Sequence, residues 1–308
     1  MKRTHRFPGS GQSGRSLIEL MIATTVSLIV LGAVMNSVVG TSSASRTQDN
    51  LARLTEDAQI ALNLITGHLR MGGYSRPRLN ALPGSPFSNY DGAAIRGCSN
   101  EFVDVAEPDL ASVACVAGTG PNAFAIAYEA DALNTLAMGA GNDEPTDCLG
   151  RILPVQASPI AGNFTVAENR FFIRNNAAGE PELACAGNGG VGFGAAQTLV
   201  SNVENLRLDY GVTETVIGPW GNNEFAGRVS RYLSAAQLDA TFAVEPVLTR
   251  WSRVSSVRVC LLMRTDDRVT DVATPYLACD GTTVTPTDRR LRVAVSSTVN
   301  LRNNSAVQ

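Results

Sequence analysis

The chain has 308 residues, which is enough for one large domain or two small ones with a hydrophobic core. Hydrophobic residues make up 44 % and charged residues 17 %, and the latter share is below the usual ~25 %. The net charge is −3, and the sequence has no basic stripe with aromatic residues beside it, so nothing indicates a nucleic acid as a partner.

The N-terminal 40 residues combine a basic flank with a long apolar run. The flank contains no Asp or Glu but several cationic or basic residues: Lys2, Arg3, His5, Arg6 and Arg15. Leu17–Val39 follows, with Glu19 as its one ionisable side chain. A helix of this length spans about 34 Å, enough for a hydrocarbon core of ~30 Å. By the positive-inside rule the flank stays in the cytoplasm, so we expect a single-pass inner-membrane helix with everything after Gly40 outside the cytoplasm.

A cleaved secretory signal is the alternative interpretation of this segment. Such signals have a shorter apolar core, of roughly 7–15 residues, and no A-x-A cleavage site follows Val39. Glu19 also argues against it, because a carboxylate at membrane depth costs about 3 kcal/mol and is usually retained for a function. A helix that packs against other helices has a use for such a group.

Gly14-Arg15-Ser16-Leu17-Ile18-Glu19 resembles the cleavage motif of type IV prepilins, which have a Gly, a new N-terminus, and a Glu at its fifth position. The resemblance implies that a prepilin peptidase cuts after Gly14 and methylates the amine of Arg15. It implies that Glu19 is an assembly carboxylate, which pairs with the N-terminus of a neighbouring subunit. Arg15 departs from the family, where Phe or Met is usual, and it puts a cation beside the new amine.

A second helical segment follows the apolar run. Thr41–Gln48 is polar and could loosen the helix, but apolar residues then recur in steps of three and four: Leu51, Leu54, Ala58, Ala61, Leu62, Ile65 and Leu69. This spacing predicts an amphipathic helix that packs on a globular head, and Gly72-Gly73 predicts its end. The expected organisation is a leader (1–14), a transmembrane assembly helix (15–40), a periplasmic amphipathic helix (41–72) and a head (73–308).

The head has the pattern of a loop-rich β structure. Short runs rich in Val, Ile and aromatic residues predict strands at Ala123–Tyr128, Asn169–Ile173, Leu206–Tyr210, Val254–Met263 and Leu291–Val299. Tyr232–Leu238 is predicted as a short helix. The predicted fold class is therefore α+β, with a long N-terminal helix packed on an antiparallel β head, as in pilins.

Several patches of the head resemble PilW-type minor pilins, which are related to the J-type minor pseudopilins. These patches are Leu51–Tyr74, Val203–Gly211, Trp251–Thr265 and Leu291–Asn303. The resemblance implies a non-catalytic subunit that helps to initiate pilus assembly, sits at or near the fibre tip and serves motility or adhesion. The implied partners are other minor pilins, the major pilin and the prepilin peptidase, and a tip adhesin is left open as a further partner. The implied location is the inner membrane, with the head in the periplasm, and later the fibre at the cell surface.

The six cysteines form no CxxC or CxxH pattern, so no metal site is predicted from them. They are Cys98, Cys115, Cys148, Cys185, Cys260 and Cys279. An even number of separated cysteines beyond a membrane segment predicts disulfides in an oxidising compartment, with the pairing left open. Buried reduced thiols are the alternative.

Little in the sequence indicates catalysis or a cofactor, and neither is predicted. His68 is the one histidine beyond the leader, and we interpret it as a helix-surface or interface residue. Gly187–Gly192 is formally a GxGxxG, but no βαβ unit surrounds it, so a flexible surface loop is favoured. Asp143, Glu144 and Asp147 could bind Ca²⁺, but without EF-hand spacing a solvated loop is favoured.

Three other functions stay open besides the minor pilin. A minor pseudopilin of a type II secretion system would share the same architecture. A membrane-tethered adhesive module would bind a ligand through its head loops. A secreted enzyme would be released by signal peptidase, although a single mature histidine disfavours most hydrolase mechanisms.

Overall fold

The computed structural model describes residues 14, 16–77, 88–90, 92–135, 143–158, 162–190, 192–217, 223–270 and 272–304. Side chains are not described at 43, 158, 215–217, 223–227 and 304. The chain divides into two compact units, residues 1–49 and 50–308, and each is treated by itself.

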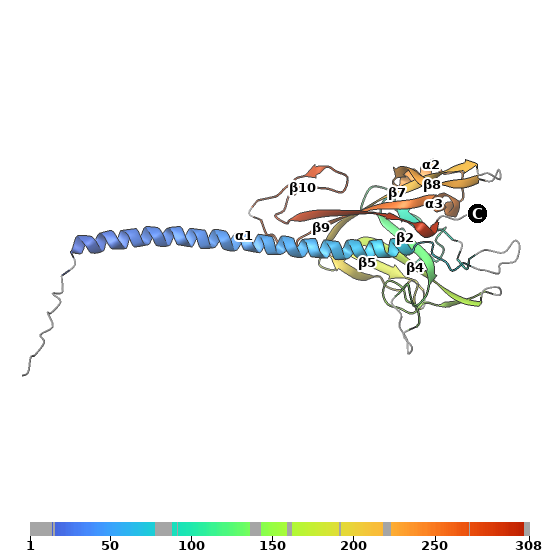
Figure 1. Cartoon of the computed structure of the whole chain (residues 1–308), viewed down its shortest axis with the longest axis horizontal. Coiled ribbons are helices and arrows are strands. Elements are labelled where there is room, and N and C mark those ends of the chain that lie inside the picture. The colour runs from blue at the N-terminus through green and yellow to red at the C-terminus, as the bar shows by residue number, and fades with distance from the viewer. Residues whose placement is uncertain are drawn as a thin grey trace, which may run out of the picture. The chain divides into compact units, whose positions relative to one another are not determined.

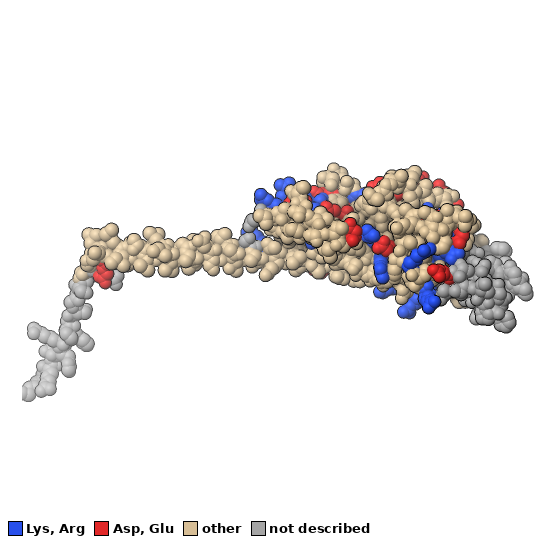
Figure 2. Space-filling model, turned by 90° about the horizontal axis from the view of Figure 1, so that it is seen from above, with Lys and Arg blue, Asp and Glu red and all other residues tan. Residues whose placement is uncertain are grey.

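One continuous helix, α1 (Leu17–Met71), crosses the boundary between the two units. In the first unit its apolar side chains are exposed, and Figure 2 shows a surface there that is almost free of charge. Among the described helices it is the one that is long and apolar enough to span a membrane. The polar stretch that could have loosened it is helical throughout. The Thr41 hydroxyl is satisfied within the helix, because it donates a hydrogen bond to the Ser37 carbonyl at 2.8 Å.

The part of α1 in the second unit is amphipathic, as its spacing predicts. Of the predicted apolar face, only Leu51 is exposed. The buried residues are Leu54, Ala58, Ala61, Leu62, Ile65 and Leu69. The helix ends at Met71, and Gly73 follows with φ of +72°, a left-handed conformation that favours glycine. A Cβ at Gly72 would lie 2.5 Å from the end of the Ile126 side chain, so Ile126 would have to shift to admit another residue there.

The head contains two larger antiparallel sheets (Figure 1). The first has the order β1-β2-β4-β5-β6, with β3 also paired to β4. Its strands are β1 (Ile95–Cys98), β2 (Ala123–Ala130), β3 (Val155–Ser158), β4 (Gly162–Asn175), β5 (Pro181–Gly187) and β6 (Gln197–Ser201). The second has the order β12-β9-β7-β8. Its strands are β7 (Val203–Ile217), β8 (Asn223–Leu233), β9 (Val254–Arg264) and β12 (Arg292–Asn300).

Smaller elements complete the head. They are the helices α2 (Ala235–Thr241) and α3 (Val247–Ser252), the hairpin β10 (Tyr276–Leu277) and β11 (Thr283–Val284), and the 3₁₀ turn η1 (Arg302–Asn304). One hydrophobic core joins α1 to both larger sheets, and its largest member is the fully buried Trp251. The predicted α+β class, a long N-terminal helix followed by antiparallel sheets, is confirmed.

All five predicted strands lie within observed strands, apart from Leu291, which precedes β12. The predicted helix Tyr232–Leu238 is wrong at its start, because Tyr232 and Leu233 end β8. The helix begins only after Ser234, whose side chain accepts a hydrogen bond from the Gln237 backbone while the Gln237 side chain accepts one from the Ser234 backbone. This capping box fixes the start of α2.

All six cysteines are paired, so the prediction of disulfides is confirmed. The pairs are Cys98–Cys115, Cys148–Cys185 and Cys260–Cys279. The sequence separations are 17, 37 and 19 residues. By loop-closure entropy each bond removes about 3–4 kcal/mol of freedom from the unfolded chain. The three bonds tie irregular segments to β1, β5 and β9, respectively.

Candidate functional site

The predicted processing site lies at the start of α1. Gly14 is exposed, and a side chain there would meet no other atom, so its backbone is accessible. Arg15 lies outside the described residues. The Ser16 carbonyl accepts hydrogen bonds from the Glu19 and Leu20 amides, which begins the helix directly after the predicted cut.

Glu19 lies in the first turn of α1 and is exposed. The first turn is the favourable end for an anion, because the unpaired helix amides carry partial positive charge there. A shallow groove runs along this face of α1, where the small side chains of Ala23, Thr24 and Ser27 lie between leucines. The leucines that line it are Leu20, Leu28 and Leu31. Small residues let a second helix approach closely. The Thr24 hydroxyl donates to the Met21 carbonyl at 3.0 Å, so it needs no partner in lipid.

His68 is half-buried where α1 packs on the head, the interface that was one of the two positions expected from the sequence. Its ring packs at 5.0 Å from the ring of Phe171 on β4. Burial lowers the pKa of His68 to about 4, so the ring is neutral at physiological pH. A cleft of about 530 Å³ adjoins it, lined also by Tyr128 and Asn134. Burial raises the pKa of Tyr128 to about 12, so this phenol is neutral as well.

In the acidic loop that was considered as a Ca²⁺ site, Asp147 has a structural role. Its side chain is fully buried, which contradicts a solvated loop at this position. Oδ1 accepts the Leu149 and Arg151 amides, and Oδ2 accepts the Gly189 amide at 3.0 Å and Arg151 Nε at 2.9 Å. These bonds occupy both carboxylate oxygens, so Asp147 fastens the loop to the segment after β5.

The formal GxGxxG segment is not a free surface loop in its described residues. Gly187 ends an antiparallel strand, and Gly187 and Gly189 are buried. A side chain at Gly189 would meet the Arg151 carbonyl and Asp147, so glycine is required there for close packing. The next described element is the strand β6, and no helix follows to receive a phosphate.

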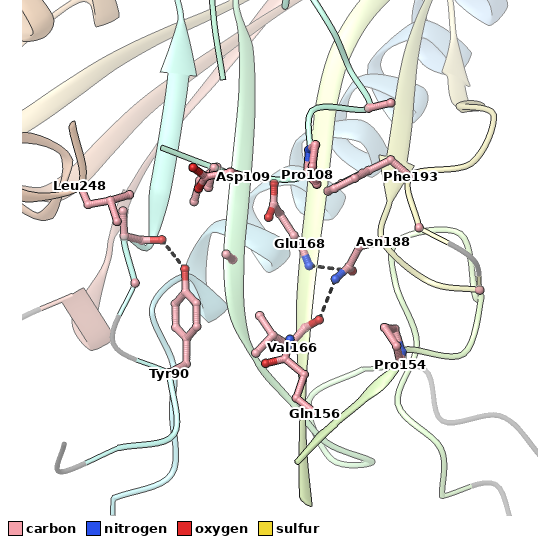
Figure 3. Close-up of a pocket in the computed structure, with 17 residues that line it drawn as sticks. Tyr90, Pro108, Asp109, Pro154, Gln156, Val166, Glu168, Asn188, Phe193 and Leu248 are labelled. Carbon is pink, nitrogen blue, oxygen red and sulfur yellow. Dashed lines mark hydrogen bonds between the residues drawn. The ribbon is translucent and has the colours of Figure 1, made fainter. Parts of the chain in front are cut away.

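Asn188 repairs a gap in the sheet beside this segment (Figure 3). On one edge of β4, β5 pairs from Asn169 onward and β3 pairs up to Thr165, which leaves Val166–Glu168 without a strand partner on that edge. Asn188 fills the gap: its side chain accepts the Glu168 amide and donates to the Val166 carbonyl, both at 2.9 Å. Its own amide donates to the Glu168 carbonyl at 3.1 Å.

A cleft of about 830 Å³ opens over this gap. Figure 3 shows Tyr90 and Leu248 along one side, Pro154 and Gln156 along another, and Asp109, Pro108 and Phe193 around Glu168. The volume lies within the range of roughly 300–1,000 Å³ that small-ligand sites occupy.

Arg170 contacts two residues that line this cleft, Glu168 and Phe193. Its side chain is fully buried. It donates to the Glu168 carboxylate and to the carbonyls of Val105 and Glu107, and it stacks at 3.8 Å on the Phe193 ring. Burial raises the pKa of Glu168, which Arg170 partly offsets. The cleft therefore presents aromatic and proline surfaces together with two carboxylates, those of Glu168 and the exposed Asp109. No group of three or more metal-ligating side chains occurs in the described part of the chain.

The fold and the start of α1 together define a class of protein. Its members have an apolar N-terminal helix with a carboxylate in the first turn, followed by a head of antiparallel sheets. Residues 170–303 match the family model described as Type IV Pilus-assembly protein W. This match confirms the resemblance to PilW-type proteins and supports a role connected with type IV pili.

Three of the four head patches that carried the resemblance fall within the matched residues. They contribute to β7, to β9 and to β12 with η1, which are neighbours in the second sheet. The patches, scattered in sequence, therefore form one continuous piece of structure.

A type IV-like pilin from Thermus thermophilus is similar in structure, with 14 % sequence identity and a TM-score of 0.39. The match covers 82 % of this chain and 99 % of that one. No curated protein sequence matches the chain significantly.

Proposed function

We propose that this chain is a non-catalytic minor pilin that helps to initiate type IV pilus assembly and sits at or near the fibre tip. The observation that carries the proposal is Glu19, an exposed carboxylate in the first turn of an apolar helix, five positions beyond Gly14. The match of residues 170–303 to the pilus-assembly family supports it.

The mechanism is physical. The apolar helix keeps the subunit in the inner membrane, and a prepilin peptidase removes residues 1–14 and methylates the amine of Arg15. The amine of one subunit then compensates the carboxylate of Glu19 in its neighbour. Polar contacts between membrane helices contribute about 0.6–2 kcal/mol, so this pair selects the register while apolar packing supplies most of the affinity.

The test compares Glu19→Ala with Asp49→Ala in cells. Asp49 is also an exposed carboxylate on α1, but it lies beyond the apolar run. We expect Glu19→Ala to lower both pilus number and co-purification with the other minor pilins, and Asp49→Ala to leave them unchanged. Normal pili and normal co-purification in Glu19→Ala would contradict the register mechanism. A gene neighbourhood that encodes a type II secretion system instead of a pilus would favour the pseudopilin.

The cleft beside Glu168 favours a second candidate, an adhesive or ligand-binding head. Gln156 lines the cleft, while the adjacent Ala157 is exposed and is not part of the lining. If the head binds a surface ligand through this cleft, Gln156→Trp abolishes adhesion with intact pili and Ala157→Trp does not. Equal adhesion in both variants would remove this candidate.

A further inference from the structure

The second sheet has one long edge that nothing in the described chain covers by hydrogen bonding. β12 pairs with β9 on one side only, in an unbroken register from Arg292 opposite Arg264 to Asn300 opposite Ser256. Just beyond the two ends, the Leu301 amide donates to the Ser255 carbonyl and the Thr265 amide donates to the Leu291 carbonyl.

These two bonds determine which residues of β12 direct their backbone N–H and C=O groups toward β9 and which direct them away from the sheet. Hydrogen-bonded pairs alternate along an antiparallel ladder, so the odd-numbered residues from Leu291 to Leu301 bond to β9. The even-numbered residues then direct both N–H and C=O away from the sheet: Arg292, Ala294, Ser296, Thr298 and Asn300. None of these backbone groups makes a hydrogen bond to another described residue outside the β9 ladder.

The β10–β11 hairpin contacts β12, and the Arg292 guanidinium lies 5.2 Å from the Tyr276 ring, but the strand itself lacks the usual features that deter another strand. Edge strands are normally short, bulged, or marked by charges or proline. β12 has nine residues, no register shift, no proline, and no charge from Val293 to Asn300.

The other edges of the two larger sheets are protected in this way, and β3, which pairs with β4 alone, has only four residues. β8 carries Arg228 and Arg231 and has register shifts against β7. β6 has five residues with a shift against β5, and β1 has four buried residues beside α2 and α3.

We infer that β12 is a docking edge for an extended strand from a different polypeptide, added antiparallel along Val293–Asn300. The chemistry of the edge specifies this strand. On the outer face it lies beside Ala294, Ser296 and Thr298, which are exposed, so small uncharged residues fit there. On the inner face it continues the row of Val293 and Val295, which pack partly against the core, so apolar β-branched residues fit at the alternate positions.

A second copy of this chain fits the edge poorly. Two β12 strands paired antiparallel would point the head parts of their α1 helices in opposite directions, because β12 and that part of α1 extend along the same direction in Figure 1. Heads of subunits assembled in one fibre would not meet in opposed orientations, a step that rests on the proposed function. Two copies could also pair parallel, with identical residues opposite each other. The outward N–H and C=O groups of the even-numbered residues would then lie directly opposite one another. A parallel pair cannot form its hydrogen bonds in this way, because the bonding residues of one strand must lie between those of the other.

Hydrogen exchange on the full-length chain in detergent micelles tests the open edge directly. In the free protein the amides of Ala294, Ser296 and Thr298 should exchange at least tenfold faster than those of Val295 and Ser297, which bond to β9. Equal protection of even and odd residues would overturn the inference.

The binding test uses overlapping synthetic peptides of about ten residues from the other pilin-like subunits and any adhesin encoded beside this chain. We expect at least one peptide to bind and to slow exchange at Ala294, Ser296 and Thr298 at least tenfold.

Ser296→Pro removes one outward N–H and no bond to β9, whereas Ser296→Ala keeps this N–H. Binding should weaken at least tenfold in the first variant and less than twofold in the second. If Ser296→Pro fails to fold, Thr298→Pro is used against Thr298→Ala in the same way. A panel without any binder, equal binding by the proline and alanine variants, or self-association through β12 would each overturn the proposal.

Discussion

Replacing Arg170 by Met should destabilise the head by about 4 kcal/mol, because it leaves a buried carboxylate without its counterion. Arg170 is fully buried and bonds the Glu168 carboxylate and the carbonyls of Val105 and Glu107. Removing one partner of a buried ion pair costs about 3–5 kcal/mol, and a buried carbonyl without a donor adds about 1–3 kcal/mol unless water reaches it. The cleft beside Glu168 admits some water, so we expect the lower part of the combined range.

The loss should depend on pH. Burial raises the pKa of Glu168, so the folded state binds this proton more tightly than the unfolded state does. Stability therefore falls as pH rises from the ordinary carboxyl value through the raised pKa. Without Arg170 this cost grows, and the variant should regain part of its stability below pH 5.

The assay is urea denaturation of the oxidised full-length chain in detergent, followed by tryptophan fluorescence, since Trp251 is buried in the core. The matched control is Arg258→Met, because Arg258 is an exposed arginine on β9 that stacks at 3.6 Å on Tyr232. We expect less than about 1 kcal/mol from the control. The double variant Arg170→Met with Glu168→Gln should recover at least 1 kcal/mol of the loss, by removing the charge. A loss below 1 kcal/mol in Arg170→Met, or no recovery in the double variant, would refute this reasoning.

Four further predictions concern the core, one disulfide and α1. Tyr210→Phe should be neutral or stabilising, because the Tyr210 hydroxyl is buried without a hydrogen-bond partner among the described residues, and thermal melting checks this. Gly97→Ala should cost about 1–3 kcal/mol, because its Cβ would lie 1.9 Å from that hydroxyl, and the loss should shrink in a Tyr210→Phe background. Replacing Cys148 and Cys185 together by Ala should cost about 4 kcal/mol in urea denaturation, from a closed loop of 37 residues, and an unchanged midpoint would contradict this. Because the pKa of His68 falls to about 4 on folding, stability is fully present above about pH 6.5 and declines toward pH 4, by at most about 3 kcal/mol. His68→Leu should remove this decline, and an identical pH profile in both proteins would contradict the assignment.

The sequence predicted the elements whose pattern is local. The steps of three and four after Asn50 predicted the amphipathic half of α1, and the alternation in Val254–Met263 and Leu291–Val299 predicted β9 and β12. The number of cysteines and their place beyond an apolar segment predicted disulfides, because both depend on composition and order alone.

The features that the sequence did not predict depend on residues far apart in the chain. β5 (Pro181–Gly187) is buried throughout and rich in small residues, so it shows no alternation to identify it. Asp147 resembles a loop residue until Gly189 and Arg151 enclose it. Nothing in the sequence around Asn188 indicates that its side chain replaces a strand partner of β4. The neighbouring glycines form a GxGxxG pattern, but this pattern does not predict such a role.

The most direct test of the central proposal is the N-terminus of the mature protein, measured by mass spectrometry on chain purified from its native membrane. The account predicts an N-terminal peptide that begins at Arg15, with residues 1–14 removed and a methyl group on the new amine. A mature chain that begins near residues 40–46 would contradict the account and favour a secreted protein, and one that retains residues 1–14 would contradict prepilin processing.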